Sequence, residues 1–317
     1  MNINDITALG LWPESKKTTT DKGIAQLEEL GYNLFYIGKN ADLYTCPGND
    51  PKVLLVRSDR CSVFDIPLNL EIDGKGVSQT AISNDGAIFA KESGIRTAIL
   101  SENVDASLEV APRCQIMELC KPLEAEVDGD IVQFEFIFRN YLTGSLFDAC
   151  QLGNDPYGLN LSSDLEQWHK FETPIFTPTT KGIKDEPLNS DTVRELFPEI
   201  ISSLEKLFKD FTKYAYDNGI VIVDTKLEVF VGADGQWILG DEILTPESSR
   251  FIDRKDFEKG DFISMDKQIL RNFAKKNSWK EKAKDLSAGQ KLEVEVPDSI
   301  KNVIIDGYET IYNRLHK

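Results

Sequence analysis

Carboxylates occur in two apolar runs that a tight turn would bring face to face. The first run, residues 219–228, becomes charged at alternate positions, and the second run is residues 237–242. An Asp-Gly pair between two such runs, here Asp234-Gly235, is the strongest short-range signal for a β-hairpin. If that pair forms a two-residue loop, Glu228 lies directly opposite Asp241 on the neighbouring strand.

The predicted hairpin is a candidate metal site. Side chains alternate along a strand, so we expect Asp224, Lys226 and Glu228 to share one face, with successive ones about 6.5–7 Å apart. Like charges directly opposite each other destabilise a sheet, and a cation between Glu228 and Asp241 would remove that penalty. Oxygen ligands suit Mg²⁺, which is commonly held by one or two carboxylates plus substrate phosphates. The alternative is that Glu228 pairs with Lys226 or another basic residue and that Asp241 only ends a strand.

Further blocks combine a cation with hydroxyl groups or glycine. They are Arg139 with Gly144-Ser145, then Ser248-Ser249-Arg250, and the polar loop 176–181 that ends in Lys181. Arginine forks onto oxyanions and glycine exposes backbone N–H groups, so such blocks can bind phosphate or carboxylate. Each block alone is more typical of a solvated loop, but their combination favours an anion-binding site.

The elements that must position these residues indicate an α+β fold. Alternating and apolar runs predict strands at 33–39, 52–57 and 130–138, with a turn at 47–51. Helical spacing predicts helices at 77–92, with Ile82, Ile88 and Phe89 buried, at 200–218, ended by Asn218-Gly219, and at 303–315, with Val303 and Ile304 on the buried face. Residues 253–289 are charged and show no clear period.

Composition favours a soluble enzyme with two lobes. The 317 residues exceed a typical single core, and we place the lobes at 1–118, which is β-rich, and at 119–317. The formal charge of −17 argues against binding to nucleic acid, which normally requires a basic patch. Anionic small substrates remain compatible with that charge if Arg and Lys gather at one site.

Compartment and metal chemistry follow from a few residue types. No apolar run approaches the ~20 residues of a membrane span, and the N-terminus lacks a basic-then-apolar signal. The five cysteines are odd in number and contain no Cys-x-x-Cys pair, which predicts free thiols in a reducing cytoplasm. With only two histidines, zinc or histidine-based chemistry has little to work with.

Motifs in a fixed order carry a resemblance to a known family. The chain resembles the SAICAR synthetase family of purine biosynthesis over roughly residues 34–273. The matching motifs are Gly38-Lys39 with Tyr44, Ser58-Asp59-Arg60-Cys61-Ser62-Val63-Phe64-Asp65, Gly74-Lys75-Gly76, Arg139 with Gly144-Ser145, Pro174-Ile175-Phe176-Thr177-Pro178 with Lys181, Asp224-Thr225-Lys226-Leu227-Glu228, Asp241-Glu242 with Ser248-Ser249-Arg250, and Asp266-Lys267 with Arg271.

The resemblance implies an ATP-dependent carbon–nitrogen ligase. Such an enzyme joins L-aspartate to 5-amino-4-carboxyimidazole ribonucleotide (CAIR), giving the succinocarboxamide SAICAR, ADP and phosphate, through an acyl phosphate. The family fold has a small antiparallel β lobe and a larger α+β lobe, similar to ATP-grasp enzymes and kinases, with ATP between them. Small molecules are then the only expected partners, apart from other copies of the chain in a homo-oligomer, and no membrane is involved.

Roles for individual residues follow from their positions in the matched motifs. ATP would be bound by Gly38, Lys39, Glu228 and Asp241, the last two through Mg²⁺. The catalytic residues would be Lys181, Asp224 and Lys226, with the two lysines stabilising charge around the reacting carboxylate. The substrate-binding residues would be Arg60, Ser62, Asp65, Lys75, Arg139, Ser145, Asp185, Ser249, Arg250 and Arg271.

Two positions depart from the family pattern and leave alternatives open. Ala41 replaces a second basic residue that many relatives carry, and Lys184 stands where the family usually has histidine. A non-catalytic nucleotide-binding relative is one alternative, although both metal carboxylates and both arginines are retained. The other is a kinase-like phosphotransferase, but the His-Arg-Asp and Asp-Phe-Gly signatures of kinases are absent.

Overall fold

A computed structural model of the protein describes residues 21–49, 51–102, 104–182, 185–287 and 290–316. These residues form two compact units. Unit 1 comprises the described parts of 1–85, 98–119 and 264–317, and unit 2 comprises 86–97 and 120–263. One junction lies close to the expected boundary after residue 118. The described part of residues 264–316, however, groups with unit 1.

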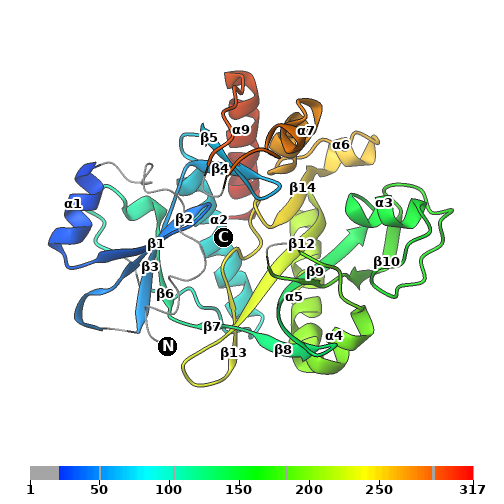
Figure 1. The fold of residues 1–317 in the computed structure, drawn as a ribbon, viewed down its shortest axis with the longest axis horizontal. Helices are drawn as coiled ribbons and strands as arrows, with labels where there is room; N and C mark the ends of the chain where they lie inside the picture. The colour runs from blue at the N-terminus through cyan, green and yellow to red at the C-terminus, as the bar shows by residue number, and fades with distance from the viewer. Residues whose placement is uncertain (1–20, 50, 103, 183–184, 288–289, 317) are drawn as a thin grey trace. The chain divides into compact units, whose positions relative to one another are not determined.

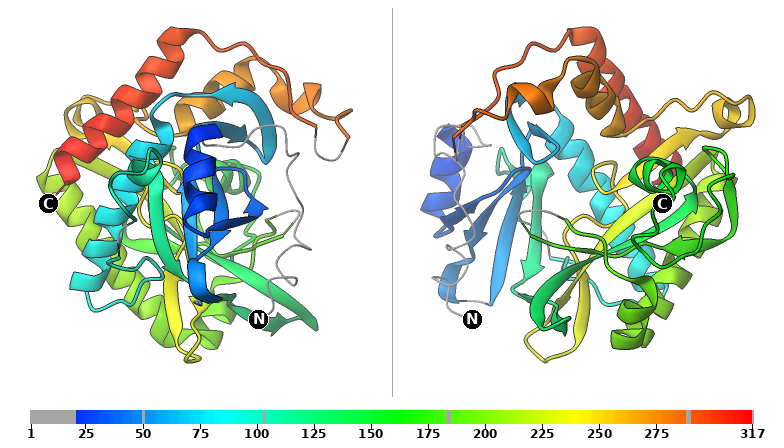
Figure 2. Two further views of the ribbon diagram at one scale, coloured as in Figure 1. Left: turned by 90° about the vertical axis from the view of Figure 1, so that its left-hand side faces the viewer. Right: turned by 45° about the vertical axis from the view of Figure 1, so that its right-hand side comes forward.

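Unit 1 is built on a four-stranded antiparallel sheet in the order β1-β2-β3-β6 (Figure 1). Its strands and the adjoining hairpin are β1 (Asn33–Ile37), β2 (Ala41–Thr45), β3 (Lys52–Arg57), β6 (Cys114–Glu118), β4 (Arg60–Val63) and β5 (Ile66–Glu71), with 3₁₀ turns η3 (Pro47–Asn49) and η4 (Ala111–Arg113). Helix α1 (Asp21–Glu29) lies beside this sheet (Figure 2). Its Leu27 is buried together with Tyr44, Leu54 and Val56 of the strands. The predicted strands at 33–39 and 52–57 are confirmed as β1 and β3.

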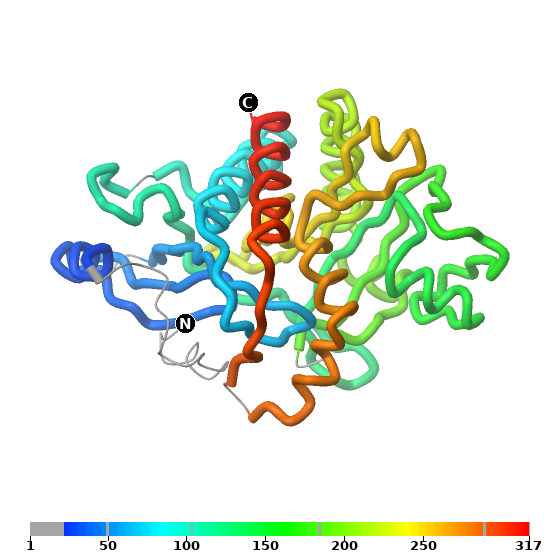
Figure 3. The backbone as a smooth tube through the Cα atoms, turned by 90° about the horizontal axis from the view of Figure 1, so that it is seen from above, coloured from blue at the N-terminus to red at the C-terminus, as the bar shows by residue number. Residues whose placement is uncertain are grey.

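The last part of the chain completes unit 1. Helices α7 (Gln268–Lys276) and α9 (Asp298–Leu315) lie side by side, and α8 (Trp279–Lys282) follows α7 (Figure 3). Leu68 of β5 forms a parallel bridge with Leu292, whose N–H donates to the Pro67 carbonyl at 2.8 Å. The Val294 N–H donates to the Asn69 side chain at 2.8 Å. These contacts join the C-terminal segment to β5 of unit 1.

Unit 2 contains an eight-stranded sheet with the central order β10-β9-β12-β13. Its strands are β7 (Lys121–Pro122), β8 (Glu124–Val127), β9 (Asp130–Tyr141), β10 (Lys170–Phe176), β11 (Thr179–Thr180), β12 (Ile220–Val231), β13 (Trp237–Gly240) and β14 (Ser249–Asp253). Its helices are α3 (Ser145–Gln151), α4 (Ser190–Leu196), α5 (Pro198–Asp217) and α6 (Arg254–Glu258). The long strands β9 and β12 run antiparallel to each other, and α5 packs against both (Figure 2).

The apolar periodicity explains how these elements pack. Helix α5 buries all six residues of its predicted stripe, Ile200, Ile201, Leu204, Leu207, Phe208 and Phe211. From β9, the side chains of Phe134, Phe136 and Phe138 are buried, and the Phe138 ring stacks on Phe208 of α5 with centroids 6.0 Å apart. The predicted α+β fold with antiparallel sheets is therefore confirmed.

Two residues predicted to lie in the core, Ile88 and Val303, are exposed. In helix α2 (Lys75–Glu92), Ile82 is buried but Ile88 is 46% exposed. The buried face of α2 includes Gly86, Ala87 and Ala90, small residues that allow close packing and do not stand out as apolar. In α9, Ile304 is buried whereas the adjacent Val303 is 47% exposed.

The register of the hairpin formed by β12 and β13, which we predicted to hold a metal ion, also differs from the prediction. Glu228 pairs with Gly240, not with Asp241, because the loop spans residues 232–236 and not Asp234-Gly235 alone. The Gly232 N–H donates to the Gln236 carbonyl at 2.9 Å, which closes this longer loop. Asp241 lies one residue beyond β13 with a positive φ of 55°, so strand alternation does not set the direction of its side chain.

No helix among the described residues is long and apolar enough to cross a membrane.

The sequence did not predict helices α6, α7 and α8, because all three begin within the stretch 253–289, which lacks a clear period. Helix α7 is short and buries only Leu270 and Ala274, which leaves too few apolar residues for the pattern to be recognised.

Candidate functional site

Two arginines that are far apart in sequence flank one carboxylate in unit 2. Asp224 on β12 is the cross-strand partner of Arg139 on β9 and of Arg250 on β14. Arg139 Nη1 donates to Asp224 Oδ2 at 2.9 Å, and Arg250 Nε donates to Asp224 Oδ1 at 2.9 Å. The central strand thus places two cations around a single anion, and the local excess of positive charge suits an anionic ligand.

The first arginine is fixed from two sides. Arg139 is 6% exposed, and its Nε donates to Thr177 Oγ1 at 2.9 Å. Burial lowers the pKa of Arg139, the Asp224 carboxylate opposes that effect, and the neighbouring Arg250 adds to it. A bound phosphate or carboxylate would stabilise the charged form of both arginines.

The loop after β9 meets the second arginine. Gly144 has a φ of +62°, and a Cβ atom there would lie 3.2 Å from Arg250 Nη1. Glycine is therefore needed for both the backbone conformation and the close approach. Ser145, the first residue of α3, follows directly and is exposed. The structure therefore brings the Gly144-Ser145 block to Arg250, as expected for one anion-binding site.

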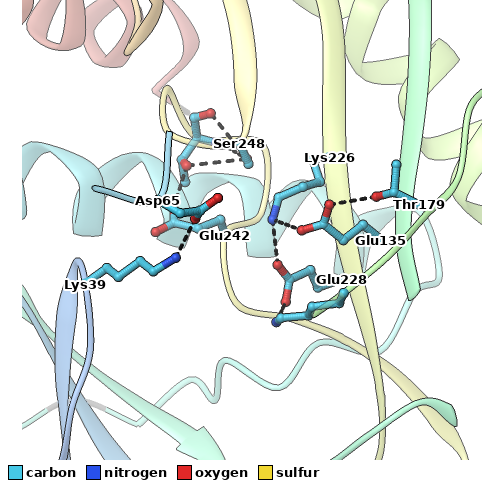
Figure 4. Close-up of polar contacts among 10 residues, drawn as sticks. Lys39, Asp65, Glu135, Thr179, Lys226, Glu228, Glu242 and Ser248 are labelled. Carbon is cyan, nitrogen blue, oxygen red and sulfur yellow. Dashed lines mark hydrogen bonds and ion pairs between the residues drawn. The ribbon is translucent and has the colours of Figure 1, made fainter. Parts of the chain in front are cut away.

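A second group of charges alternates in sign across β9, β12 and the residue that follows β11. Lys226 Nζ donates to Glu228 Oε1 at 2.8 Å and to Glu135 Oε1 at 2.6 Å (Figure 4). The other oxygen of Glu228 accepts from Lys181, and the other oxygen of Glu135 accepts from Thr179 Oγ1 at 2.9 Å. We call these five residues the lysine–carboxylate group.

Burial and neighbouring charges shift the pKa values here in opposite directions. Burial alone would raise the pKa of Glu228, but Lys226 and Lys181 outweigh it and lower that pKa to about 2. Burial raises the pKa of Asp241 to about 6, and the carboxylates of Glu228 and Glu242 add to the rise. Asp241 directly follows Gly240, the strand partner of Glu228, so the two carboxylates influence each other although they are not strand partners.

These carboxylates fit a Mg²⁺ site completed by a substrate. No group of three or more His, Cys, Asp or Glu side chains among the described residues is placed to hold a metal ion by itself. Mg²⁺, however, is usually bound by one or two carboxylates plus phosphates. The repulsion between Glu228 and Asp241, visible in the raised pKa of Asp241, is what a cation would relieve.

The raised pKa of Asp241 predicts a pH-dependent difference in stability. In the folded protein the carboxyl keeps its proton up to about pH 6, whereas in the unfolded chain it loses the proton near its ordinary pKa of 3.8. The folded state binds more protons in this window, so stability falls as the pH rises through it.

Asparagine cannot ionise, so Asp241→Asn removes this effect. Urea unfolding in the presence of EDTA, from about pH 4 to about pH 7, should show the variant gaining stability over wild type as the pH rises. A stability difference that is the same at every pH would contradict the raised pKa.

In unit 1, a buried ion pair organises the predicted glycine-lysine hairpin. Arg60, 5% exposed, donates through Nη2 to Asp42 Oδ1 at 2.6 Å and to the Gly38 carbonyl at 2.8 Å. A Cβ atom at Gly38 would lie 2.7 Å from the Ala41 carbonyl oxygen, so the turn requires glycine. Lys39 lies in this turn, and its side chain forms an ion pair with Asp65 (Figure 4). Arg60 therefore has a structural role in this turn, and its contact with substrate stays a prediction.

The other predicted substrate residues belong to both units, and their contact with substrate stays a prediction. Ser249 shares a hydrogen bond of 2.7 Å with Thr225, and Lys75 Nζ lies 3.5 Å from Gln79 Oε1. Of the remaining residues, Ser62 is buried on β4, Arg271 is partly exposed on α7, and Asp185 is exposed. Lys184, which departs from the family pattern, lies outside the described residues.

Sequence reasoning missed Glu135, the partner of Lys226. Its signal is present in the sequence as a single carboxylate inside the apolar stretch Phe134-Glu135-Phe136-Ile137-Phe138. Glu135 is 5% exposed, and a buried charge needs a partner, so an acidic residue in a core strand is a candidate site residue. Thr177 and Thr179 lie in the polar block 176–181 that the sequence singled out, but their partners Arg139 and Glu135 could not be predicted from it.

Comparisons with known proteins identify the family of this chain. The SAICAR synthetase family profile matches residues 34–286. Phosphoribosylaminoimidazole-succinocarboxamide synthase of Desulfotalea psychrophila is 33% identical over 264 residues, covering 78% of this chain and 85% of that protein. The synthase of the same name from Histophilus somni is 31% identical over 304 residues, covering 92% and 100%.

Solved structures give the same result for the fold. The SAICAR synthase of Saccharomyces cerevisiae, determined in complex with SAICAR, superposes with a TM-score of 0.71 at 25% sequence identity. The match covers 95% of this chain and 97% of the yeast chain. Sequence and fold agree over most of the protein, and the chain belongs to the SAICAR synthetase family.

Proposed function

We propose that this protein is the ATP-dependent ligase of purine biosynthesis that joins L-aspartate to CAIR and releases SAICAR, ADP and phosphate. The observation that carries the proposal is the placement of Asp224, Lys226 and Glu228 along one strand. Asp224 lies between two arginines, and Glu228 lies between two lysines near Asp241. This is the arrangement expected for an anionic substrate beside a metal–nucleotide, and the yeast relative solved with SAICAR supports it.

The chemistry needs an activated carboxylate, because a free carboxylate is a poor electrophile. The γ-phosphoryl group of ATP is transferred to a carboxylate oxygen of CAIR, and ADP leaves. The aspartate amino group then attacks the carbonyl carbon of the acyl phosphate, so that a C–N bond forms, the C–O bond to phosphate breaks and the nitrogen releases its protons. Phosphoryl transfer depends mainly on positioning and charge stabilisation, which suits a site rich in charged side chains.

Residues of the chain divide these tasks. Arg139, Arg250 and Ser145 bind the anionic ribonucleotide, and Lys39 contacts the phosphates of ATP. Lys226 and Lys181 stabilise negative charge that develops at the reacting carboxylate. Glu228 and Asp241 hold Mg²⁺, which when bound neutralises charge on the transferring phosphoryl group.

A coupled assay of ADP release, with each substrate omitted in turn, tests the proposal. Steady ADP release should require ATP, CAIR and L-aspartate together, and SAICAR should form in equal amount. Continuous ADP release without aspartate, with a phosphorylated hydroxyl product, would instead indicate a kinase-like phosphotransferase. Nucleotide binding without any turnover would indicate a non-catalytic relative in which the changes at Ala41 and Lys184 have removed activity.

A further inference from the structure

Both oxygens of Glu228 are engaged by lysines in this structure. Lys226 occupies Oε1 at 2.8 Å, and Lys181 occupies Oε2. A divalent cation that takes one oxygen of Glu228 displaces the ammonium group bonded to that oxygen, because both oxygens already accept from a lysine. The displaced lysine then needs another partner, since a buried charge without one is costly.

Each lysine already has a second contact. Lys181 Nζ lies 5.7 Å from the centre of the Phe230 ring, and its side chain is 40% exposed, so it can be released toward an aromatic face and water. Lys226 is held by Glu135 at 2.6 Å, the shorter of its two carboxylate contacts. Glu135 is itself fixed by the hydroxyl of Thr179 at 2.9 Å.

We propose that Glu135 is a positioning residue that keeps Lys226 partnered while Glu228 exchanges its lysines for a divalent cation. Strands β9 and β12 are paired along this stretch, so neither backbone needs to move. Lys226 gives up its bond to Glu228, retains the bond to Glu135 and remains beside the reacting groups. The inference rests on the proposed function, because the cation is the one expected with ATP.

The charges of the group support this exchange. Two lysines and the carboxylates of Glu135 and Glu228 balance one another. Without Glu135, Lys226 would have only Glu228 as a carboxylate partner within the lysine–carboxylate group, and it would compete with the cation for that carboxylate. Removal of Glu135 should therefore weaken cation binding, even though Glu135 is not itself a cation ligand.

Binding of Mn²⁺ in the presence of ADP tests this inference without turnover. Free Mn²⁺ is measured from its electron paramagnetic resonance signal. Glu135→Gln keeps the size of the side chain and should weaken Mn²⁺ binding by about tenfold, equivalent to about 1.4 kcal/mol. Glu172→Gln, which removes an exposed carboxylate from β10, should leave the affinity unchanged. Equal affinity in wild type and Glu135→Gln would overturn the inference while leaving the proposed function intact.

Two further variants separate positioning from simple loss of charge or of folding. Thr179→Val keeps the charge of Glu135 but frees one of its oxygens, so it should weaken Mn²⁺ binding by about two- to threefold, within the range of a single neutral hydrogen bond. If the effect of Glu135 were purely electrostatic, Thr179→Val would leave the affinity for Mn²⁺ unchanged.

The double variant Glu135→Gln/Lys226→Met removes the competing lysine and should recover most of the lost affinity for Mn²⁺. A folding defect caused by Glu135→Gln would persist in the double variant.

The crystal structure of the complex with Mn²⁺ and ADP gives the direct result. Lys226 should be bonded to Glu135 and not to Glu228. A structure in which Lys226 still contacts Glu228, or has left Glu135, would overturn the inference. Failure of the wild-type protein to bind Mn²⁺ with ADP would instead count against the metal site of the proposed function.

Discussion

Replacement of Glu228 by glutamine should remove almost all ligase activity and leave the protein folded. The side chain keeps its size but loses the charge that would bind the cation. We expect kcat in the ADP-release assay to fall by roughly 10²–10³-fold, the usual scale for loss of one preorganised electrostatic group. Near-normal turnover would contradict the assignment of Glu228 to the metal site.

At neutral pH, Glu228→Gln should lower the free energy of unfolding, whereas Asp241→Asn should raise it. The pKa of Glu228 is lowered from 4.5 to about 2, so its ionised form stabilises the folded state above pH 4.5, and this contribution is lost as the pH falls toward 2. Glu228→Gln should therefore be less stable than wild type at neutral pH. Asp241→Asn should lose activity too but gain stability at that pH, which separates a catalytic defect from unfolding.

Replacement of Arg250 by alanine should weaken binding of the imidazole ribonucleotide much more than binding of ATP. A hydrogen bond to a charged group contributes about 1.5–3 kcal/mol, so KM for CAIR should rise by roughly 10- to 150-fold. Asp224 still has Arg139 as a partner in the variant, which limits the damage to the fold.

Arg254→Ala is the matched control for this prediction. Arg254 is close to Arg250 in the chain, but its guanidinium lies over the Tyr216 ring and its Nη1 donates to the Tyr216 carbonyl at 2.9 Å. We expect KM for CAIR to stay near the wild-type value in this variant. An equal rise of KM for ATP and CAIR in Arg250→Ala would remove Arg250 from the ribonucleotide site.

Long periodic elements were predictable, because many residues contribute to each pattern. Helix α5 has six apolar positions in register, and β12 has an apolar run that becomes charged at alternate residues. The arginines on β9 and β14 could not be joined to Asp224 by such local patterns. Their meeting depends on strand pairing between distant segments, and here the ordered family motifs supplied the missing information.

Single-residue details were the least predictable. The hairpin register depends on the length of one loop, and the closing bond between Gly232 and Gln236 shifts the partner of Glu228 by one residue. Asp241 remains next to the strand partner of Glu228, because it directly follows Gly240 in the chain. The partnership of Glu135 with Lys226 is set by the β9–β12 register, which neither strand specifies alone.

The bridge between Leu68 and Leu292 has a consequence for biosynthesis. Domains tend to fold as units while the chain emerges from the ribosome. Most of unit 2 lies in the continuous stretch 120–263, so it can close while later residues are still being added. Unit 1 is complete only when the described part of residues 264–316 has been made, although its sheet is made first. During translation, β5 therefore lacks its partner at Leu292 until most of the chain has been made.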